Sequence, residues 1–321
     1  LAAMLTEERG NYPGLAGLDL RVVAVFTRGH GALLDAKGIG LEKVLTQFCA
    51  SGAFPAAQVT ALQALETMDY DVLVELSTLS IAEKGEPAIS HVRAALERGK
   101  HAVTANKGPA AFAHAELEAL ARAKGVRFLF ESAVMDGAPV FSLGPALAGC
   151  RVTGISGILN TTTNFVISRL EAGEGMAEAV ATAQRLGFAE ADPSLDLEGW
   201  DAAAKTAILA NYYLGAGIDP LRVERRGISG LTADAAARVA AAGRRLKLIC
   251  RAEFACGKVR TKVGLEEIDA GHLFASVSGK GAALRLETDM MGPLWIIQED
   301  PGLNDTAAGV LQDLLRVAAS R

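Results

Sequence analysis

The sequence lacks the features that would place the chain on nucleic acid or in a membrane. Its formal net charge is -5, and its lysines and arginines are scattered among acids instead of forming a basic stripe. No apolar run reaches the roughly 18 residues that span a bilayer, and no charged leader precedes a short apolar segment. We therefore expect a cytoplasmic protein whose partners include neither nucleic acid nor a membrane.

Cysteine is also scarce. Cys49, Cys150, Cys250 and Cys256 have neither the density of a disulfide scaffold nor the paired spacing of metal ligands, so we interpret them as reduced thiols in the core or at its boundary. The rest is an ordinary globular composition, with 50% hydrophobic and 21% charged residues. A chain of 321 residues can bury a sizeable core, and its length favours about two domains.

The first part of the chain alternates between apolar strands and helices. Runs typical of strands buried on both faces lie at residues 20–26, 71–76, 101–104 and 126–130. Helices are predicted at 1–9, 87–98 and 109–124. Because each parallel crossover needs a covering helix, this pattern predicts a doubly wound α/β unit with its ligands at the carboxyl ends of the strands.

After residue 130 the rhythm changes to longer loops, Ala-rich helices and alternating segments. Strands are predicted near residues 151–159, 247–254, 259–263 and 283–287, and an amphipathic helix at 305–319. We interpret this part as a second, α+β domain.

One motif ends a predicted strand in a small-residue turn, Gly99-Lys100-His101-Ala102-Val103-Thr104-Ala105-Asn106-Lys107. It places the Lys107 ammonium at the carboxyl edge of the strand, where it could hold a polar substrate or cofactor group. Burial could also lower its pKa towards a role in proton transfer. The pattern fits equally a solvated lysine that merely follows a strand.

A second motif is an acidic run before a helix, Glu190-Ala191-Asp192-Pro193-Ser194-Leu195-Asp196-Leu197-Glu198-Gly199-Trp200-Asp201-Ala202-Ala203-Ala204-Lys205. Asp201 and Lys205 are four residues apart and share a helix face that is apolar beyond Lys205. A lysine pointed into such packing is costly unless it is paired or has a function. These groups could bind an amino acid, although such acids also fit a charged loop at a helix start.

A third motif, Asn160-Thr161-Thr162-Thr163-Asn164-Phe165, follows a predicted buried strand. Its hydrogen-bonding side chains could bind a ligand, and one of them could simply cap a helix. We expect both roles among these side chains, ligand binding for some and helix capping for one.

At these three motifs the sequence resembles the homoserine dehydrogenase family. It matches the family's Gly-Lys-x-x-Val-Thr-Ala-Asn-Lys, Asn-x-Thr-x-Asn and Glu-x-Asp-Pro-x-x-Asp-x-x-Gly-x-Asp-x-x-x-Lys stretches in order and spacing. The resemblance implies interconversion of L-aspartate 4-semialdehyde and L-homoserine, in the biosynthesis of threonine, methionine and isoleucine. It implies a Rossmann-type cofactor domain from residues 1–131 with 300–321, and a central α+β domain, 132–299, for substrate binding and dimerisation.

The resemblance also implies roles for individual residues. Lys205 is the expected proton donor to the aldehyde oxygen, and Lys107 and Asp201 complete the catalytic group. The residues expected to bind substrate are Glu190, Asp196, Asp201 and Lys107. Those expected to bind the cofactor are Arg28, Ser77, Thr78, Lys107, Gly187 and Gly302. Main-chain oxygens of Glu131, Val134, Asp136 and Ala138 are expected to hold a monovalent cation such as sodium, although Asp136-Gly137 also fits a plain turn.

The cofactor signals depart from the family in two places. The Gly-x-Gly-x-x-Gly turn is absent, and we expect it and the first strand to lie upstream of Leu1. Near the C-terminus only Gly302 matches the family's Gly-rich stretch.

Thr27-Arg28 stands where NAD sites usually place an acid, so we expect NADP to be used at least as well as NAD, with Arg28 on the 2′-phosphate. A solvated Arg28 remains an alternative.

Other functions stay open on the sequence alone. They are another amino-acid dehydrogenase on the same scaffold and a nucleotide-sensing protein without turnover. The absence of a cysteine in a polar turn argues against a phosphorylating semialdehyde dehydrogenase, which needs a thiolate nucleophile. We expect a homodimer, because the strands of the central domain leave a sheet edge and an apolar face that a two-fold mate can cover.

Overall fold

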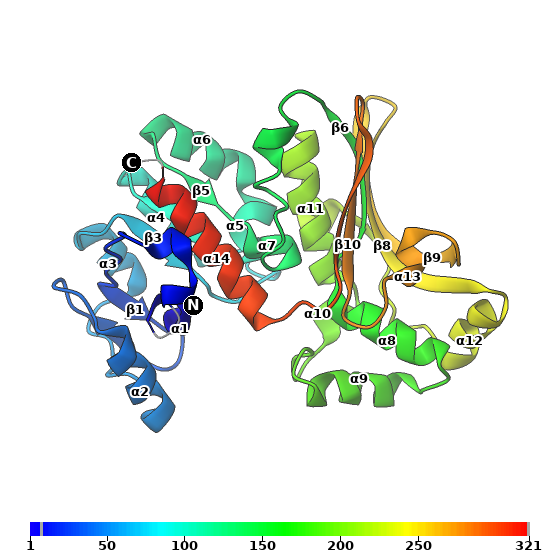
Figure 1. Ribbon diagram of the computed structural model, residues 1–321, viewed down its shortest axis with the longest axis horizontal. Coiled ribbons are helices and arrows are strands. Elements are labelled where there is room, and N and C mark those ends of the chain that lie inside the picture. The colour runs from blue at the N-terminus through cyan, green and yellow to red at the C-terminus, as the bar shows by residue number, and fades with distance from the viewer. Residues whose placement is uncertain (7–8, 320–321) are drawn as a thin grey trace.

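The computed structural model describes residues 1–6 and 9–319 and arranges them around two main sheets (Figure 1). A three-stranded sheet lies in the N-terminal half, and a six-stranded sheet lies in the C-terminal half. The last helix, α14 (Leu303–Ala318), returns from the second sheet to pack on the first.

The three-stranded sheet is parallel and covered on both faces. Its order is β3 (Val72–Glu75), β4 (His101–Thr104) and β5 (Phe128–Leu129). On β4, Ala102 belongs to a hydrophobic cluster with α4 (Ala88–Glu97) and α6 (His114–Lys124), whereas Val103 packs against α14. Because successive residues of a strand point to opposite faces, the helices lie on both sides of the sheet, as the doubly wound prediction requires.

The strand predicted at residues 20–26 does not join this sheet. Only Ala24–Phe26 forms a strand, β1, and it pairs antiparallel with β2 (Ala32–Leu34). The residues of β1 are all partly exposed, so the prediction of burial on both faces is wrong. The turn explains the difference, because Thr27 donates to the main-chain oxygen of Gly31 from both its N–H (3.1 Å) and its hydroxyl (2.8 Å). A partner strand a few residues away competes well with a distant parallel one.

The six-stranded sheet is antiparallel except where β7 meets β9. Its order is β11-β10-β6-β8-β9-β7. The strands are β6 (Val152–Ile158), β7 (Glu224–Arg225), β8 (Arg244–Ala255), β9 (Lys258–Asp269), β10 (Ala282–Thr288) and β11 (Gly292–Gln298). β9 is longer than predicted, and β11 was not predicted.

The remaining helices connect the sheets and cover them. They are α1 (Ala2–Leu5), α2 (Leu41–Ser51), α3 (Ala61–Thr67), α5 (Lys107–Phe112), α7 (Ser132–Met135), α8 (Thr161–Glu171), α9 (Met176–Arg185), α10 (Ser194–Leu197), α11 (Trp200–Leu214), α12 (Ala233–Ala241) and α13 (Leu273–Ser276). α11 packs against α5 on one side and against β6, β8 and β9 on the other (Figure 1). It therefore brings the two halves together.

Other details differ from the sequence-based expectations. The helix predicted at 109–124 is two helices, α5 and α6, which meet at Ala113. The helix predicted at 1–9 is seen over Ala2–Leu5, and residues 7 and 8 lie outside the described residues. Cys49 and Cys256 are exposed instead of lying at the core. In the part of the chain that the structure describes, no helix has the length and apolarity needed to cross a bilayer.

Candidate functional site

Buried polar side chains fix the backbone where β3 and β4 end. Glu75 and Thr104 are paired in register, and the Thr104 hydroxyl donates to Oε2 of Glu75 (3.1 Å). The other Glu75 oxygen accepts from the N–H of Ser77 (2.9 Å). Asn106 caps α5 and donates from Nδ2 to the Ser77 hydroxyl (3.2 Å) and to the main-chain oxygen of Thr78 (3.4 Å). Ser77 and Thr78 are thereby held beside the start of α5 at the carboxyl edge of the parallel sheet.

Lys107, Asp201 and Lys205 form one charged cluster across two helices. Lys107 is the first residue of α5, and the other two lie one turn apart on α11. Nζ of Lys107 is 3.2 Å from Oδ1 of Asp201, and Nζ of Lys205 is 3.3 Å from Oδ2. Lys205 also donates to the main-chain oxygen of Leu159 (2.7 Å). One carboxylate therefore faces two ammonium groups, which come from different halves of the molecule.

Asn160 connects this cluster to a second acid. Its Oδ1 caps α8 by accepting from the N–H of Thr163 (2.8 Å), and its Nδ2 donates to Asp201 (2.9 Å) and to Asp196 (2.6 Å). The capping role expected within the polar turn is thus present at Asn160, and ligand binding by the turn stays a prediction. We did not predict that Asn160 would join the two acids, because the only signal in the sequence was an Asn directly after a buried strand.

The charges of the cluster shift one another's protonation. The negative charge of Asp201 is the main cause that raises the pKa of Lys107 above its ordinary value. Burial alone would raise the pKa of Asp201, but Lys205 and Lys107 outweigh it and hold that pKa below its usual range. Burial, aided by the charge of Asp201, raises the pKa of Asp196. The site can therefore offer the lysine ammonium groups to an oxygen atom of a ligand, and the aspartate carboxylates to an ammonium group of a ligand.

Four of the residues predicted to bind substrate or cofactor have no hydrogen bond or ion pair, within residues 1–6 and 9–319, to this cluster or to Asn106. Glu190 is exposed, and no described residue pairs with its carboxylate. Gly187 is exposed after α9, with φ of 80°. Gly302 precedes α14, and its N–H donates to Asp305 (2.8 Å). Arg28 is exposed in the turn after β1. The structure alone does not bring these four together with the two lysines.

The residues expected to hold a cation lie in and around α7. Glu131 precedes this helix, Val134 is buried within it, and Asp136 and Ala138 follow. Asp136 has φ of 48°, which is unusual for a residue with a side chain, and its carboxylate accepts from the hydroxyl of Thr306 on α14 (2.7 Å). The main-chain oxygen of Ala138 accepts from the N–H two residues later (2.7 Å), which leaves one lone pair.

No group of three His, Cys, Asp or Glu side chains suited to a metal ion is found in the described ranges. A cation at α7 would therefore depend on main-chain oxygens. The main-chain oxygen of Ala138 still has a lone pair with which to bind one.

Comparisons with known proteins cover both halves of the chain. A family model described as homoserine dehydrogenase matches residues 139–315, and one described as the NAD binding domain of homoserine dehydrogenase matches residues 1–131. The NAD(+)-dependent homoserine dehydrogenase of Pseudomonas canavaninivorans is 37% identical, over 100% of this chain and 93% of that protein. The homoserine dehydrogenase of Methanocaldococcus jannaschii is 33% identical, over 93% of this chain and 89% of that protein.

Solved structures give the same similarity. The crystal structure of an Archaeoglobus fulgidus protein, provisionally assigned as a homoserine dehydrogenase, matches with a TM-score of 0.86 and 31% identity, over 98% of this chain and 94% of that one. The structure of a homoserine dehydrogenase from Thiobacillus denitrificans matches with a TM-score of 0.76 and 34% identity, over 85% of this chain and 63% of that one.

Proposed function

Because this chain belongs to the homoserine dehydrogenase family, we propose that it interconverts L-aspartate 4-semialdehyde and L-homoserine. The observation that carries the proposal is the cluster in which Asp201 faces both Lys107 and Lys205 at the carboxyl edge of the parallel sheet. A bound nicotinamide cofactor supplies or accepts the hydride. The side chains of this protein bind the substrate and move the proton.

Lys205 is the proposed proton donor to the carbonyl oxygen. Negative charge builds on that oxygen during reduction, and a nearby ammonium both stabilises the charge and supplies a proton. An ammonium has three N–H groups, and the contacts of Lys205 to Asp201 and to the main-chain oxygen of Leu159 take two of them. The third remains for a substrate oxygen, and Lys107 lies across the same carboxylate.

The acids are proposed to bind the ammonium group of the substrate. Asp201 and Asp196 are held together by Asn160, so an arriving cation meets two adjacent carboxyl groups. Glu190 is exposed and unpaired among the described residues, which leaves its carboxylate available for the same cation. Lys107 would bind a substrate oxygen from the opposite side.

The cofactor is proposed to lie along the ends of β3 and β4, in a domain made of residues 1–131 with 300–321. Substrate binding then belongs to residues 132–299. The hydroxyl and main-chain groups of Ser77 and Thr78, held by Asn106, suit polar cofactor groups beside Lys107. Gly187 and Gly302 are exposed and would contact the rest of the cofactor.

We propose that NADP is used at least as well as NAD, with Arg28 binding the 2′-phosphate. Arg28 is exposed and follows β1, where it is free to meet a phosphate. The relative from Pseudomonas canavaninivorans is NAD(+)-dependent, so both cofactors need to be compared.

A monovalent cation such as sodium is proposed at the main-chain oxygens of Glu131, Val134, Asp136 and Ala138. The Asp136 carboxylate already accepts a hydrogen bond from Thr306 of α14. A cation bound to the main-chain oxygens would further stabilise the turn after α7, next to the charged cluster.

A turnover assay with L-aspartate 4-semialdehyde tests the proposed reaction, with NADPH and NADH supplied separately. We expect oxidation of at least one cofactor and formation of homoserine. Turnover with a different amino acid, but not with this semialdehyde, would point to another dehydrogenase on the same scaffold. Cofactor binding with no turnover of any amino acid would point to a nucleotide-sensing protein.

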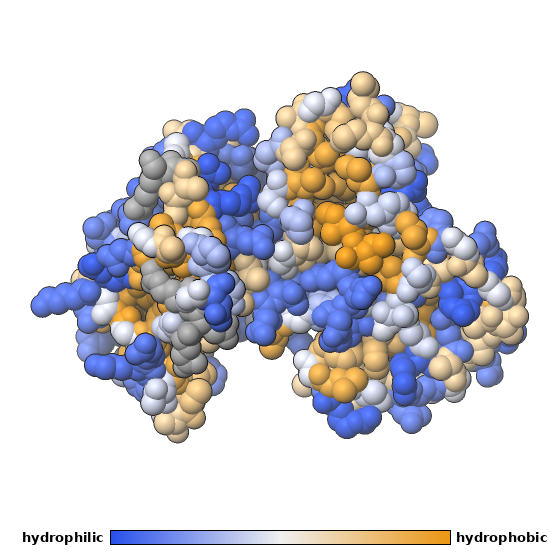
Figure 2. Space-filling model, in the orientation of Figure 1, coloured by the Kyte–Doolittle hydropathy of each residue, from blue (hydrophilic) through white to orange (hydrophobic). Residues whose placement is uncertain are grey.

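A homodimer is proposed through the six-stranded sheet, whose outermost strands are β11 and β7. Phe254, Met290, Met291 and Ile297, all in or next to β8, β10 and β11, are exposed large hydrophobic residues. Figure 2 shows hydrophobic side chains gathered over α11 and the adjoining part of this sheet. An exposed apolar surface at a sheet edge is a typical contact for a second copy.

A further inference from the structure

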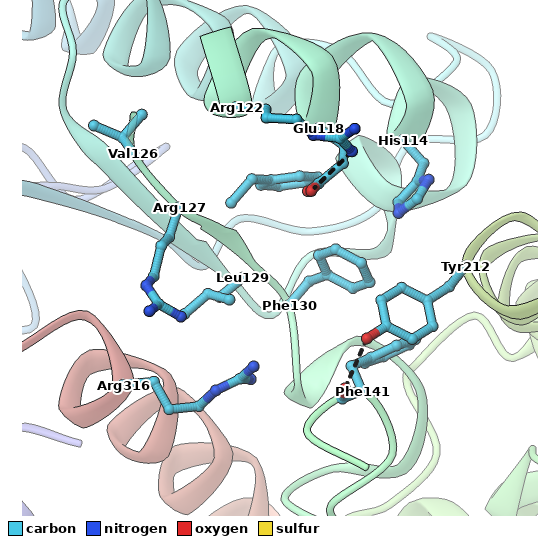
Figure 3. A pocket seen from close by; sticks show the side chains of 11 residues that line it. His114, Glu118, Arg122, Val126, Arg127, Leu129, Phe130, Phe141, Tyr212 and Arg316 are labelled. Carbon is cyan, nitrogen blue, oxygen red and sulfur yellow. Dashed lines mark hydrogen bonds and ion pairs between the residues drawn. The ribbon is translucent and has the colours of Figure 1, made fainter. Parts of the chain in front are cut away.

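A pocket of about 450 Å³ lies among α6, β5, α11 and α14 (Figure 3). None of the residues that line it belongs to the cluster of Lys107, Asp201 and Lys205. Its volume falls within the roughly 300–1,000 Å³ common for small-molecule sites. The pocket is therefore large enough for a ligand of its own.

One wall of the pocket is aromatic. The ring centroids of Phe130 and Phe141 are 4.6 Å apart, and those of Phe141 and Tyr212 are 5.0 Å apart. The Tyr212 hydroxyl donates to the main-chain oxygen of Phe141 (2.8 Å), as Figure 3 shows. Phe130 and Phe141 are buried, whereas Tyr212 is partly exposed. Because the hydroxyl of Tyr212 is already engaged, its ring face is what this wall offers to a ligand.

The opposite side of the pocket is lined by charged side chains. Three guanidinium groups line it, from Arg122, Arg127 and Arg316, against one carboxylate, from Glu118. Glu118 is 3.6 Å from Arg122, so this pair is already satisfied.

Arg127 and Arg316 differ in their partners. Arg316 contacts the buried acids Asp313 (3.1 Å) and Glu131 (3.4 Å). The side chain of Arg127 has no hydrogen bond or ion pair to any residue that the structure describes. In Figure 3 both guanidinium groups extend into the same space, between the strand and α14. The two acids neutralise Arg316, so the Arg127 guanidinium is the lining charge without a counter-charge, which a bound anion would supply.

We propose that this pocket is a second small-molecule site, which binds an organic carboxylate that carries an aromatic ring. Arg127 receives the carboxylate in the planar, bidentate geometry that guanidinium groups favour, with Arg316 beside it. The ring packs on the partly exposed Tyr212. The two halves of the ligand thus match the two sides of the pocket.

Fluorine NMR of two matched probes tests this proposal on the whole protein. The probe 4-fluorophenylacetate carries both ring and charge, whereas 4-fluorophenylacetamide keeps the ring and lacks the charge. We expect the acetate to bind at least about tenfold more tightly, since a charge-assisted contact is worth more than a tenfold change in Kd. Arg127→Ala should weaken acetate binding by about tenfold. The matched control Arg222→Ala, at an exposed arginine away from the pocket, should leave it unchanged.

Three results would overturn the proposal. They are equal affinity for the two probes, unchanged acetate binding in the Arg127 variant, and displacement of the acetate by saturating NADP with L-homoserine. The last result would place the probe in the dehydrogenase site. Because Arg127 is exposed and its side chain has no partner among the described residues, loss of binding in its variant would not come from misfolding.

Discussion

The Lys205 ammonium lies between the carboxylate of Asp201 and the main-chain oxygen of Leu159. If it supplies the proton, Lys205→Ala should lower kcat by about 10²- to 10⁴-fold, the usual contribution of general acid catalysis. The Kd of the cofactor should barely change, because the lost interaction is made in the transition state. Steady-state kinetics and a cofactor titration measure the two effects. Lys43→Ala, at an exposed lysine of α2, is the control and should alter neither.

A different outcome would reassign the role. If Lys205→Ala keeps a near-normal kcat and only KM rises, Lys205 binds the substrate, and Lys107 becomes the better proton donor.

Arg28 is predicted to set the preference for NADP. Its guanidinium would make a charge-assisted contact with the 2′-phosphate, so Arg28→Ala should lower the ratio of kcat/KM with NADP to kcat/KM with NAD by about tenfold. The exposed Arg21, on the same segment of chain, provides the control variant Arg21→Ala. An unchanged ratio in the Arg28 variant would mean that this residue is a solvated part of the turn.

Only part of the site could be predicted from the sequence. The pairing of Asp201 with Lys205 follows from their spacing on one helix, and the structure places their charged atoms 3.3 Å apart. Asn160 and Glu75 carry no such local signal. Their roles depend on which strands and helices meet in space, and a single sequence does not contain that information in its spacing.

At the scale of elements, a buried hydrogen bond joins α14 to Glu131, the residue that precedes α7. Asp313 accepts from the N–H of Glu131 (2.8 Å), and burial raises the pKa of its carboxyl group to about 6. The folded state therefore holds the proton more tightly than the unfolded state, where the pKa is 3.8. The resulting stabilisation is complete below about pH 4 and is lost as the pH rises through about 6; it amounts to about 3 kcal/mol.

Urea unfolding of the protein and of Asp313→Asn, across this pH range, measures that contribution. The difference in unfolding free energy between the two should fall by about 3 kcal/mol between pH 4 and pH 7.5, because the variant cannot titrate at this position. A difference that does not vary with pH would mean that contacts with Arg316 and with the N–H of Glu131 offset burial completely.

The elements that sequence analysis predicted well are those with strong local signals. β4 coincides with the predicted strand at 101–104, and α4 differs from the helix predicted at 87–98 only at its ends. The errors arise where tertiary contacts decide. The run at 20–26 found a partner in a neighbouring hairpin, and α5 and α6 separate at Ala113, where nothing in the sequence disfavours a continuous helix.

At the scale of the whole molecule, the prediction is a homodimer. Sedimentation at micromolar concentration should give twice the mass of one chain, because the exposed residues of β11 would be covered by a second copy. Ile297→Asp should shift the protein towards monomer, since it places a charge in the proposed contact. Val59→Asp changes an exposed residue before α3 and should leave the dimer intact. A monomer for the unmodified protein would contradict the proposal.

Helix α14 leaves the ribosome after both sheets have been synthesised, yet it covers one face of the first. Val103 and Leu129, which pack against α14, therefore lack their cover while the second sheet is still being made. Contacts between distant segments form slowly, and uncovered apolar strands favour aggregation. This face of the parallel sheet can be covered only once residue 318 has emerged. The yield of folded protein should accordingly depend on the rate of translation and on the supply of chaperones.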